Sequence, residues 1–183
     1  MSAARYFIAL LPPEPIRSEA WSLKEHMRDR YRSSGALLSP PHITLHMPFE
    51  WEDRKFGRLS DGLTHLAGSL DPIEIVISGF GCFPPRVLFL SVEKSPALTD
   101  LQHKVRDFCR LEFHLLNDRF RDQPFHPHLT IGFRDLRKTE FHQAWEEFKD
   151  STFNARFTVS EFVLLKHNGR SWDELQSYPF RIQ

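Results

Sequence analysis

The sequence predicts an α+β protein with two pseudo-symmetric α/β lobes, in which antiparallel sheets face a central cleft and helices lie on the outside. Two observations lead to this prediction. The pattern Pro-His-apolar-Thr-apolar occurs twice, at residues 41–45 and 127–131. Each copy follows a similar series of a strand, a proline-opened helix and a polar loop. We therefore expect residues 1–183 to form one bilobal domain, a size that suits a single core.

The two motifs are predicted to lie on strands, where successive side chains point to opposite faces. His42 and Thr44 then share one face, and His128 and Thr130 share the corresponding face of the second strand. By chance, a chain with 10 His would contain two such matches with a probability of about 10⁻⁴ or below. Together the two faces would form a symmetric site suited to acid–base chemistry on phosphate without a metal.

The first half of the chain is predicted to contain, in order, a strand, a helix, the first motif strand and a second helix. These elements are expected at residues 5–11, 14–31, 37–47 and 51–70. Both helices have apolar residues at helical spacing. In the first helix these residues are Ile16, Ala20, Leu23 and Met27, and in the second they are Phe56, Leu59, Leu63 and Leu66.

The second half repeats this order and adds a C-terminal hairpin. Strands are predicted at 73–80, 86–92, 125–134, 157–166 and 175–182, with turns at Gly81, at 84–85 and at 168–169. Ser95 is expected to cap a helix that runs to about Arg110, because proline follows it at the first helical position. Residues 112–123 are predicted to form a loop, and residues 139–150 a short helix.

The composition limits the choice of partners. The chain has 24 basic and 24 acidic residues, so its formal net charge is zero. Long nucleic acid is held by many phosphate contacts, which a neutral chain is not built to supply. A small phosphorylated ligand or the end of an RNA remains compatible with a few local cationic groups. We expect a monomer that needs no obligate protein partner.

Cysteine usage and hydropathy point to a soluble cytoplasmic protein. Cys82 and Cys109 form no metal-binding or redox spacing, so both are expected to be small buried side chains in a reducing compartment. No apolar run approaches the ~20 residues of a membrane span. The apolar stretch at residues 6–11 is too short for a signal peptide.

The paired motifs and the duplicated order resemble the two-histidine (2H) phosphoesterase superfamily. Within it, the chain is most similar to the 2′-5′ RNA ligase and RNA 2′,3′-cyclic phosphodiesterase group. The resemblance is carried by 42–45 and 128–131, and by their flanking segments 39–41, 48–50 and 123–127. It implies the 2H phosphoesterase fold. It also implies hydrolysis of 2′,3′-cyclic phosphodiesters, at RNA 3′ ends or in small cyclic nucleotides, to 2′-phosphates without a cofactor. The reverse reaction would join RNA through a 2′-5′ linkage.

Opening a cyclic phosphodiester needs a base on one side of phosphorus and an acid on the other. Histidine titrates near pH 6.5, so two imidazoles can divide these roles. By resemblance, His42 is predicted to be the acid and His128 the base. The hydroxyl groups of Thr44 and Thr130 are predicted to donate hydrogen bonds to the non-bridging oxygens.

Five further residues are candidates for substrate binding. His46 shares the face of His42 by spacing, and the aromatic residues close to the motifs could stack on a base. The family places an arginine shortly after the second motif, whereas Arg134 comes one residue later, which turns a strand side chain to the other face. The candidates are His46, Phe49, Phe125, Phe133 and Arg134.

Three alternatives stay open at the level of sequence. His126 and His128 could converge with His42 and His46 on zinc, which accepts imidazole ligands. The same cleft could instead bind a nucleotide or an RNA end without turnover. Within the enzyme class, the substrate could be a different cyclic or 2′-5′ phosphodiester.

Overall fold

A computed structural model describes residues 3–116 and 124–181. The strands are β1 (Ala3–Leu10), β2 (Ile43–Glu52), β3 (Ile73–Phe83), β4 (Val87–Val92), β5 (His128–Gly132), β6 (Asn154–Val159), β7 (Glu161–His167) and β8 (Trp172–Pro179). The helices are α1 (Ile16–Tyr31), α2 (Phe56–Ala67), α3 (Pro96–Phe113) and α4 (Lys138–Phe148), with short 3₁₀-helices η1 (Gly35–Leu38) and η2 (Asp53–Lys55).

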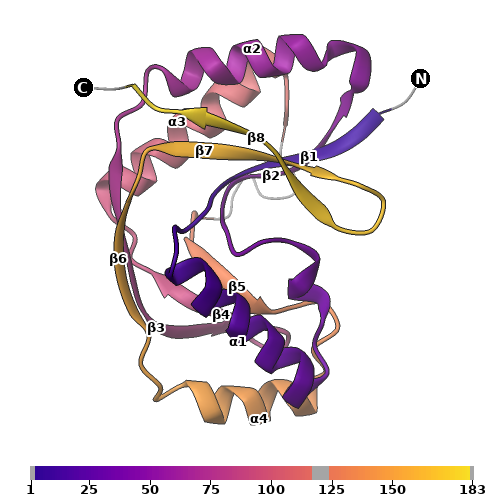
Figure 1. Cartoon of the computed structure of the whole chain (residues 1–183), viewed down its shortest axis with the longest axis vertical. Helices are drawn as coiled ribbons and strands as arrows, with labels where there is room; N and C mark the ends of the chain where they lie inside the picture. Colours follow the sequence, from indigo (N-terminus) through magenta and orange to yellow (C-terminus); the bar gives the residue numbers. More distant parts are fainter. Residues whose placement is uncertain (1–2, 117–123, 182–183) are drawn as a thin grey trace.

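The eight strands form one curled antiparallel sheet in the order β6-β3-β4-β5-β2-β1-β7-β8 (Figure 1). The two motif strands, β5 and β2, are neighbours at its centre. Each half of the sheet has a motif strand on the inside, followed outward by β4, β3 and β6 or by β1, β7 and β8. The predicted α+β class is confirmed. The two facing sheets expected from the sequence are the two halves of one continuous sheet.

The helices divide evenly between the two halves and cross over between them. α2 and α3 lie with β7 and β8, whereas α1 and α4 lie at the other end of the molecule (Figure 1). α1 follows β1 in the chain but packs against β5, in the opposite half. α3 likewise follows β4 and packs against β2 of the opposite half, as well as against β3 of its own. Each half is therefore packed against a helix that follows a strand of the other half, and these contacts connect the two halves.

The sheet carries a large core on one face and a small apolar cluster on the other. Alternation along β1 sends Tyr6, Ile8 and Leu10 into the large core. Phe7 and Ala9 point to the opposite face. There they form the small cluster with Val163 and Leu165 of β7, and Leu11 and Trp172 pack against it. The large core therefore lies on the helix-covered face of the sheet, and the small cluster lies on the other face.

Several element boundaries differ from those predicted. The first motif strand begins at Ile43 instead of Leu37, because residues 35–38 form η1 and the prolines at 40 and 41 lack the N–H groups that a sheet needs. β2 continues through residues 51 and 52, so α2 starts only at Phe56. β3 runs through Gly81 to Phe83, and the predicted strand 157–166 is divided at Ser160 into β6 and β7.

Two local predictions are confirmed in detail. The Leu98 amide donates to Ser95 Oγ at 3.1 Å, which makes Ser95 the N-cap of α3. The Asn168-Gly169 turn joins β7 to β8, and Gly169 adopts a φ of +100°, a conformation that favours glycine. Of the predicted loop 112–123, the first two residues belong to α3, and residues 117–123 lie outside the described residues.

Candidate active site

The two motif strands meet at a single backbone pair, Ile43 with Leu129. Both side chains are fully buried in the large core. In an antiparallel register centred on this pair, residue 42 lies across from 130 and residue 44 across from 128. Alternation then places the two histidines and two threonines of the motifs on the opposite face of the sheet. All four side chains are half-buried.

His42 is oriented by a backbone carbonyl and an aromatic ring. Its Nδ1 lies 2.7 Å from the carbonyl oxygen of Pro40. Because a carbonyl oxygen can only accept, Nδ1 carries the hydrogen, and Nε2 holds the lone pair of the neutral ring. The ring of Phe7 lies 4.9 Å from the imidazole at an interplanar angle of 50°.

His128 has nearly the same surroundings in the other half of the sheet. Its Nδ1 lies 2.7 Å from the carbonyl oxygen of His126, again two residues upstream. The ring of Phe89 lies 5.0 Å away at an interplanar angle of 50°. Both histidines are therefore held in the same tautomer, in which Nε2 can accept a proton.

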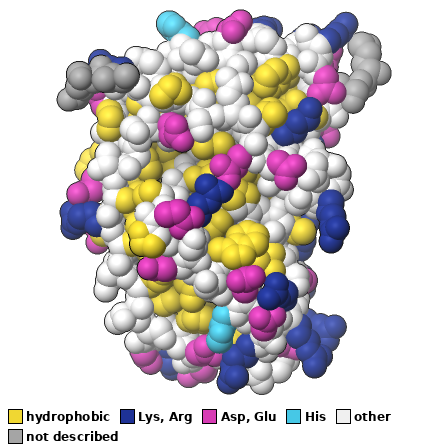
Figure 2. Space-filling view, in the orientation of Figure 1, with side chains coloured by type: hydrophobic (Ala, Val, Ile, Leu, Met, Phe, Trp, Pro, Cys, Tyr) yellow, Lys and Arg dark blue, Asp and Glu magenta, His cyan; other side chains and the backbone are white. Residues whose placement is uncertain are grey.

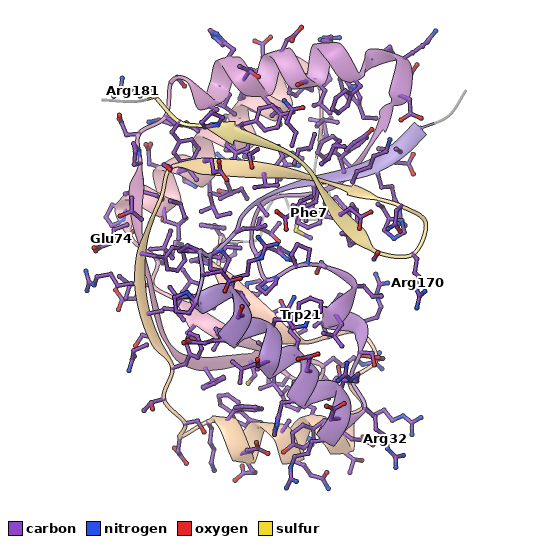
Figure 3. The ribbon with its side chains drawn as sticks, in the orientation of Figure 1. Phe7, Trp21, Arg32, Glu74, Arg170 and Arg181 are labelled. Carbon is purple, nitrogen blue, oxygen red and sulfur yellow. The ribbon has the colours of Figure 1, made fainter. Side chains whose placement is uncertain are left out.

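A second aromatic side chain supports each phenylalanine. Trp172 meets Phe7 edge-on at 4.8 Å, and Phe83 lies 4.6 Å from Phe89. Phe83 also meets the His128 ring at 5.2 Å and is 38% exposed. Figure 3 places Phe7 between the two ends of the molecule, above Trp21 of α1.

Sequence reasoning did not identify Phe7 or Phe89 as parts of the site. The available signal was the repeat itself, since β1 and β4 occupy matching places in the two halves and each contributes one of these rings. β1 pairs directly with β2, and β4 pairs directly with β5. Each phenylalanine is thus set beside its histidine by an adjacent strand.

Electrostatics favour the neutral form of both imidazoles. Burial lowers the pKa of His42 well below its usual range, and the positive charge of Lys24 and the neighbouring His128 lower it further. Burial also lowers the pKa of His128, with a smaller contribution from His126. At neutral pH, each Nε2 of the ligand-free site therefore presents a lone pair.

Two of the predicted substrate-binding residues lie in the core instead. Phe49 is 8% exposed and stacks on Tyr6. His46 is 2% exposed, because the pairing of β1 with β2 skips Leu45 and sets His46 opposite the core-facing Ile8. Such a β-bulge re-aims the side chains that follow it. The prediction that His46 shares the face of His42 is wrong for this reason.

The other three candidates lie close to the second motif. Phe125 is half-buried at the edge of the large core. Phe133 is 42% exposed, and the guanidinium carbon of Arg134 lies 5.6 Å from the centre of its ring. Arg134, two residues beyond the end of β5, adopts a φ of +69°, so simple strand alternation does not determine its direction. Phe133 and Arg134 remain predicted contacts for substrate.

A carboxylate links the segment after the second motif to the segment before the first. Asp135 accepts hydrogen bonds from Ser33 Oγ at 3.0 Å and from the amides of Ser34 and Gly35 at 2.8 and 3.0 Å. A Cβ atom at Gly35 would lie only 2.4 Å from the Phe133 carbonyl oxygen, so this approach requires glycine. The connection holds η1 against the end of β5.

The four-imidazole zinc arrangement is not formed by the residues that the structure describes. His46, which it requires, points into the core. Within residues 3–116 and 124–181, no three His, Cys, Asp or Glu side chains are grouped so that they could bind a metal ion. In the same part of the chain, no helix is long and apolar enough to span a membrane. Figure 2 shows acidic and basic side chains interspersed over one face of the molecule.

The fold is that of a known group of solved structures. TT0787 of Thermus thermophilus superposes with a TM-score of 0.68 at 22% identity, covering 97% of this chain and 98% of that one. LigT of E. coli in its apo form superposes with a TM-score of 0.66 at 22% identity, covering 100% of both chains. The curled antiparallel sheet with four helices is thus a LigT-like 2H phosphoesterase fold.

Sequence comparison gives the family. The model of the 2′-5′ RNA ligase superfamily matches residues 12–171, and the chain belongs to this superfamily. A Bacillus cereus (strain G9842) protein named "Putative phosphoesterase" is 35% identical over 127 residues, which is 68% of this chain and 67% of that protein. A protein of the same general name from Geobacillus sp. (strain WCH70) is 36% identical over 130 residues, or 70% and 68% of the two chains.

Proposed function

We propose that this protein opens 2′,3′-cyclic phosphodiesters, at RNA 3′ ends or in small nucleotides, to 2′-phosphates without using a metal. The observation that supports this most is the pair of matched imidazoles. Each has its Nδ1–H engaged by a carbonyl two residues upstream, so each Nε2 is left for proton transfer. Simple anion binding would not require two histidines held in this way.

The reaction needs two proton transfers on opposite sides of phosphorus. Water gives a proton to Nε2 of the base, His128, as its oxygen forms the new bond to phosphorus. The bond from phosphorus to the ribose 3′-oxygen breaks, and this oxygen takes the Nε2 proton of the acid, His42. Each such transfer contributes roughly 10²–10⁴ in rate. The product is a ribose 2′-phosphate.

Binding of the anionic substrate would stabilise the protonated form of one imidazole, which the ligand-free site disfavours. The pKa of both imidazoles is lowered in the ligand-free protein. A negatively charged phosphodiester placed beside them favours the imidazolium form of one ring, since an opposite charge within a few ångströms raises the pKa of a histidine. The hydroxyls of Thr44 and Thr130 would donate to the non-bridging oxygens, where charge accumulates.

The same groups would serve a ligation reaction. If the 5′-hydroxyl of a second RNA attacks in place of water, the cyclic phosphate opens to a 2′-5′ linkage, and the 3′-oxygen again takes the proton of the acid. Water at its normal concentration favours hydrolysis by mass action. A solved LigT structure complexed with 3′-AMP, with a TM-score of 0.64 at 22% identity and 98% and 99% coverage, supports a nucleotide as the ligand class.

A substrate panel tests the proposal. The purified full chain is incubated with 2′,3′-cyclic nucleotides of all four bases and with short RNAs that end in a cyclic phosphate, with and without EDTA. We expect 2′-phosphate products, resolved from 3′-phosphates by ³¹P NMR, with equal rates in EDTA and a bell-shaped pH profile. Tight binding without any product would favour the binding module, and activity only with added zinc would favour the metal alternative.

A further inference from the structure

Lys24 is a buried lysine whose role the proposed reaction leaves unexplained. Its side chain is 1% exposed on α1, and its Nζ donates to the carbonyl oxygens of Ala36 and Ser39, both at 2.9 Å. Among the described residues, no carboxylate forms an ion pair with it. Burial, with a smaller effect from Arg17, lowers the pKa of Lys24 to about 7. Removing such a group from water is costly.

The two hydrogen bonds of Lys24 hold the turn that orients His42. Ser39, whose carbonyl it binds, is joined directly to Pro40, whose carbonyl accepts the Nδ1–H of His42. The other bond, to Ala36, holds η1 on the far side of the same turn. A displacement of this turn would therefore move the imidazole.

The charge of Lys24 also acts on His42. After burial, Lys24 is the largest contributor to the lowered pKa of His42, and His128 is the other titratable group that acts on it. The effect on the second motif is different. His126 is the titratable neighbour that contributes to the pKa of His128.

We propose that Lys24 is a positioning residue for His42 alone, which fixes its turn and places a positive charge beside it, so that the two matched histidines become chemically unequal. The proposal rests on the proposed function for its catalytic meaning. Below a pH of about 7, where Lys24 is protonated, its charge disfavours the imidazolium form of His42 and makes that form, once generated by the bound substrate, a stronger proton donor. This agrees with the acid role predicted for His42.

The test compares Lys24→Met, which removes charge and donor, with Lys24→Gln, which removes the charge and keeps a donor. Lys104→Met, at an exposed position of α3, is the matched control. NMR titration of the imidazoles without substrate should give a His42 pKa about one unit higher in both Lys24 variants, with His128 unchanged. We expect kcat to fall about tenfold or more in Lys24→Met and less in Lys24→Gln, and one limb of the pH profile to move upward.

Two results would overturn the inference: an unchanged pKa of His42 in both variants, or equal shifts of His42 and His128. If neither variant folds, NMR titration of the wild-type chain tests the inference instead. The resonances of His42, and not those of His128, should then show an inflection at the pH where Lys24 titrates, and its absence refutes the inference. Since these titrations need no turnover, a failed proposed function would appear separately, as a coupled Lys24–His42 pair without phosphodiesterase activity.

Discussion

The two motif sites agree closely in geometry and differ in charge. In each, Nδ1 lies 2.7 Å from a carbonyl oxygen two residues upstream, and a phenylalanine ring lies 4.9 or 5.0 Å away at 50°. The buried Lys24 acts on His42, whereas the titratable neighbour that acts on His128 is the exposed His126. The geometry comes from the sheet, and the difference in charge comes from a helix.

This difference teaches how a duplicated fold can serve an asymmetric reaction. The acid and the base must be placed equivalently on either side of phosphorus, and two equivalent strands provide this placement. They also need different proton affinities, which two equivalent strands cannot provide. One residue of α1, which crosses from the first half to pack against β5, breaks the equivalence without disturbing the strands.

The largest effect is expected from removing either imidazole. His42→Ala and His128→Ala should each lower kcat on a 2′,3′-cyclic nucleotide by about 10²–10⁴, because each loses one proton transfer. The double variant should be little worse than either single variant, since the two groups act as a unit. His103→Ala, on the exposed side of α3, is the control and should keep full activity. Near-normal turnover in either single variant would contradict the assignment of both histidines.

The hydroxyls come next in size. Thr44→Val and Thr130→Val keep the side-chain shape and lose the donor, so we expect kcat to fall by about 10²–10³ in each. Thr→Ser at either position should restore most of the activity. The ratio of the two losses in kcat compares the two sites directly, and it should be near one if the hydroxyls are equivalent. A loss at only one position would show that the phosphate lies closer to one strand.

The smallest effect is on stability as pH changes. The pKa of His42, His46 and His128 is lowered in the folded chain, so between those values and about 6.5 the unfolded chain binds protons that the folded chain does not. The free energy of unfolding should therefore fall as pH drops below about 6.5, by at most about 1.4 kcal/mol per pH unit for each site.

Urea denaturation at pH 7.5, 6.5 and 5.5 measures this slope. We expect His42→Ala to flatten the dependence of stability on pH more than His128→Ala does. The reason is that the charge of Lys24, in addition to burial, lowers the pKa of His42. Equal stability at pH 5.5 and 7.5 would mean that the motif imidazoles are not protected from protonation in the folded chain.

The sequence predicted most of the elements because their signals are local. The apolar stripes of the helices, the Ser95 cap and the Asn168-Gly169 turn each depend on a few neighbouring residues. The motif alternation likewise assigns His42 and Thr44 to one face of a strand. These predictions need no knowledge of what lies across the sheet.

The differences arise where a distant segment decides the outcome. The bulge at Leu45 follows from the pairing of β2 with β1, and it turns His46 into the core. Phe49 is buried because Tyr6 of β1 lies beside it. In the sequence, Lys24 is one of many polar residues of α1, although it follows Ala20 by four residues and thus shares the buried stripe of that helix.

By itself, the sequence determined which four side chains could act together, because a period of two along each motif leaves His and Thr on one face. Only the tertiary structure decided that the two motif strands are neighbours, joined at Ile43 and Leu129. It also decided that carbonyls fix both tautomers and that a buried lysine holds the turn before one histidine. Strand pairing and burial bring together residues that are far apart in the chain, and no local sequence pattern shows which of these residues will meet.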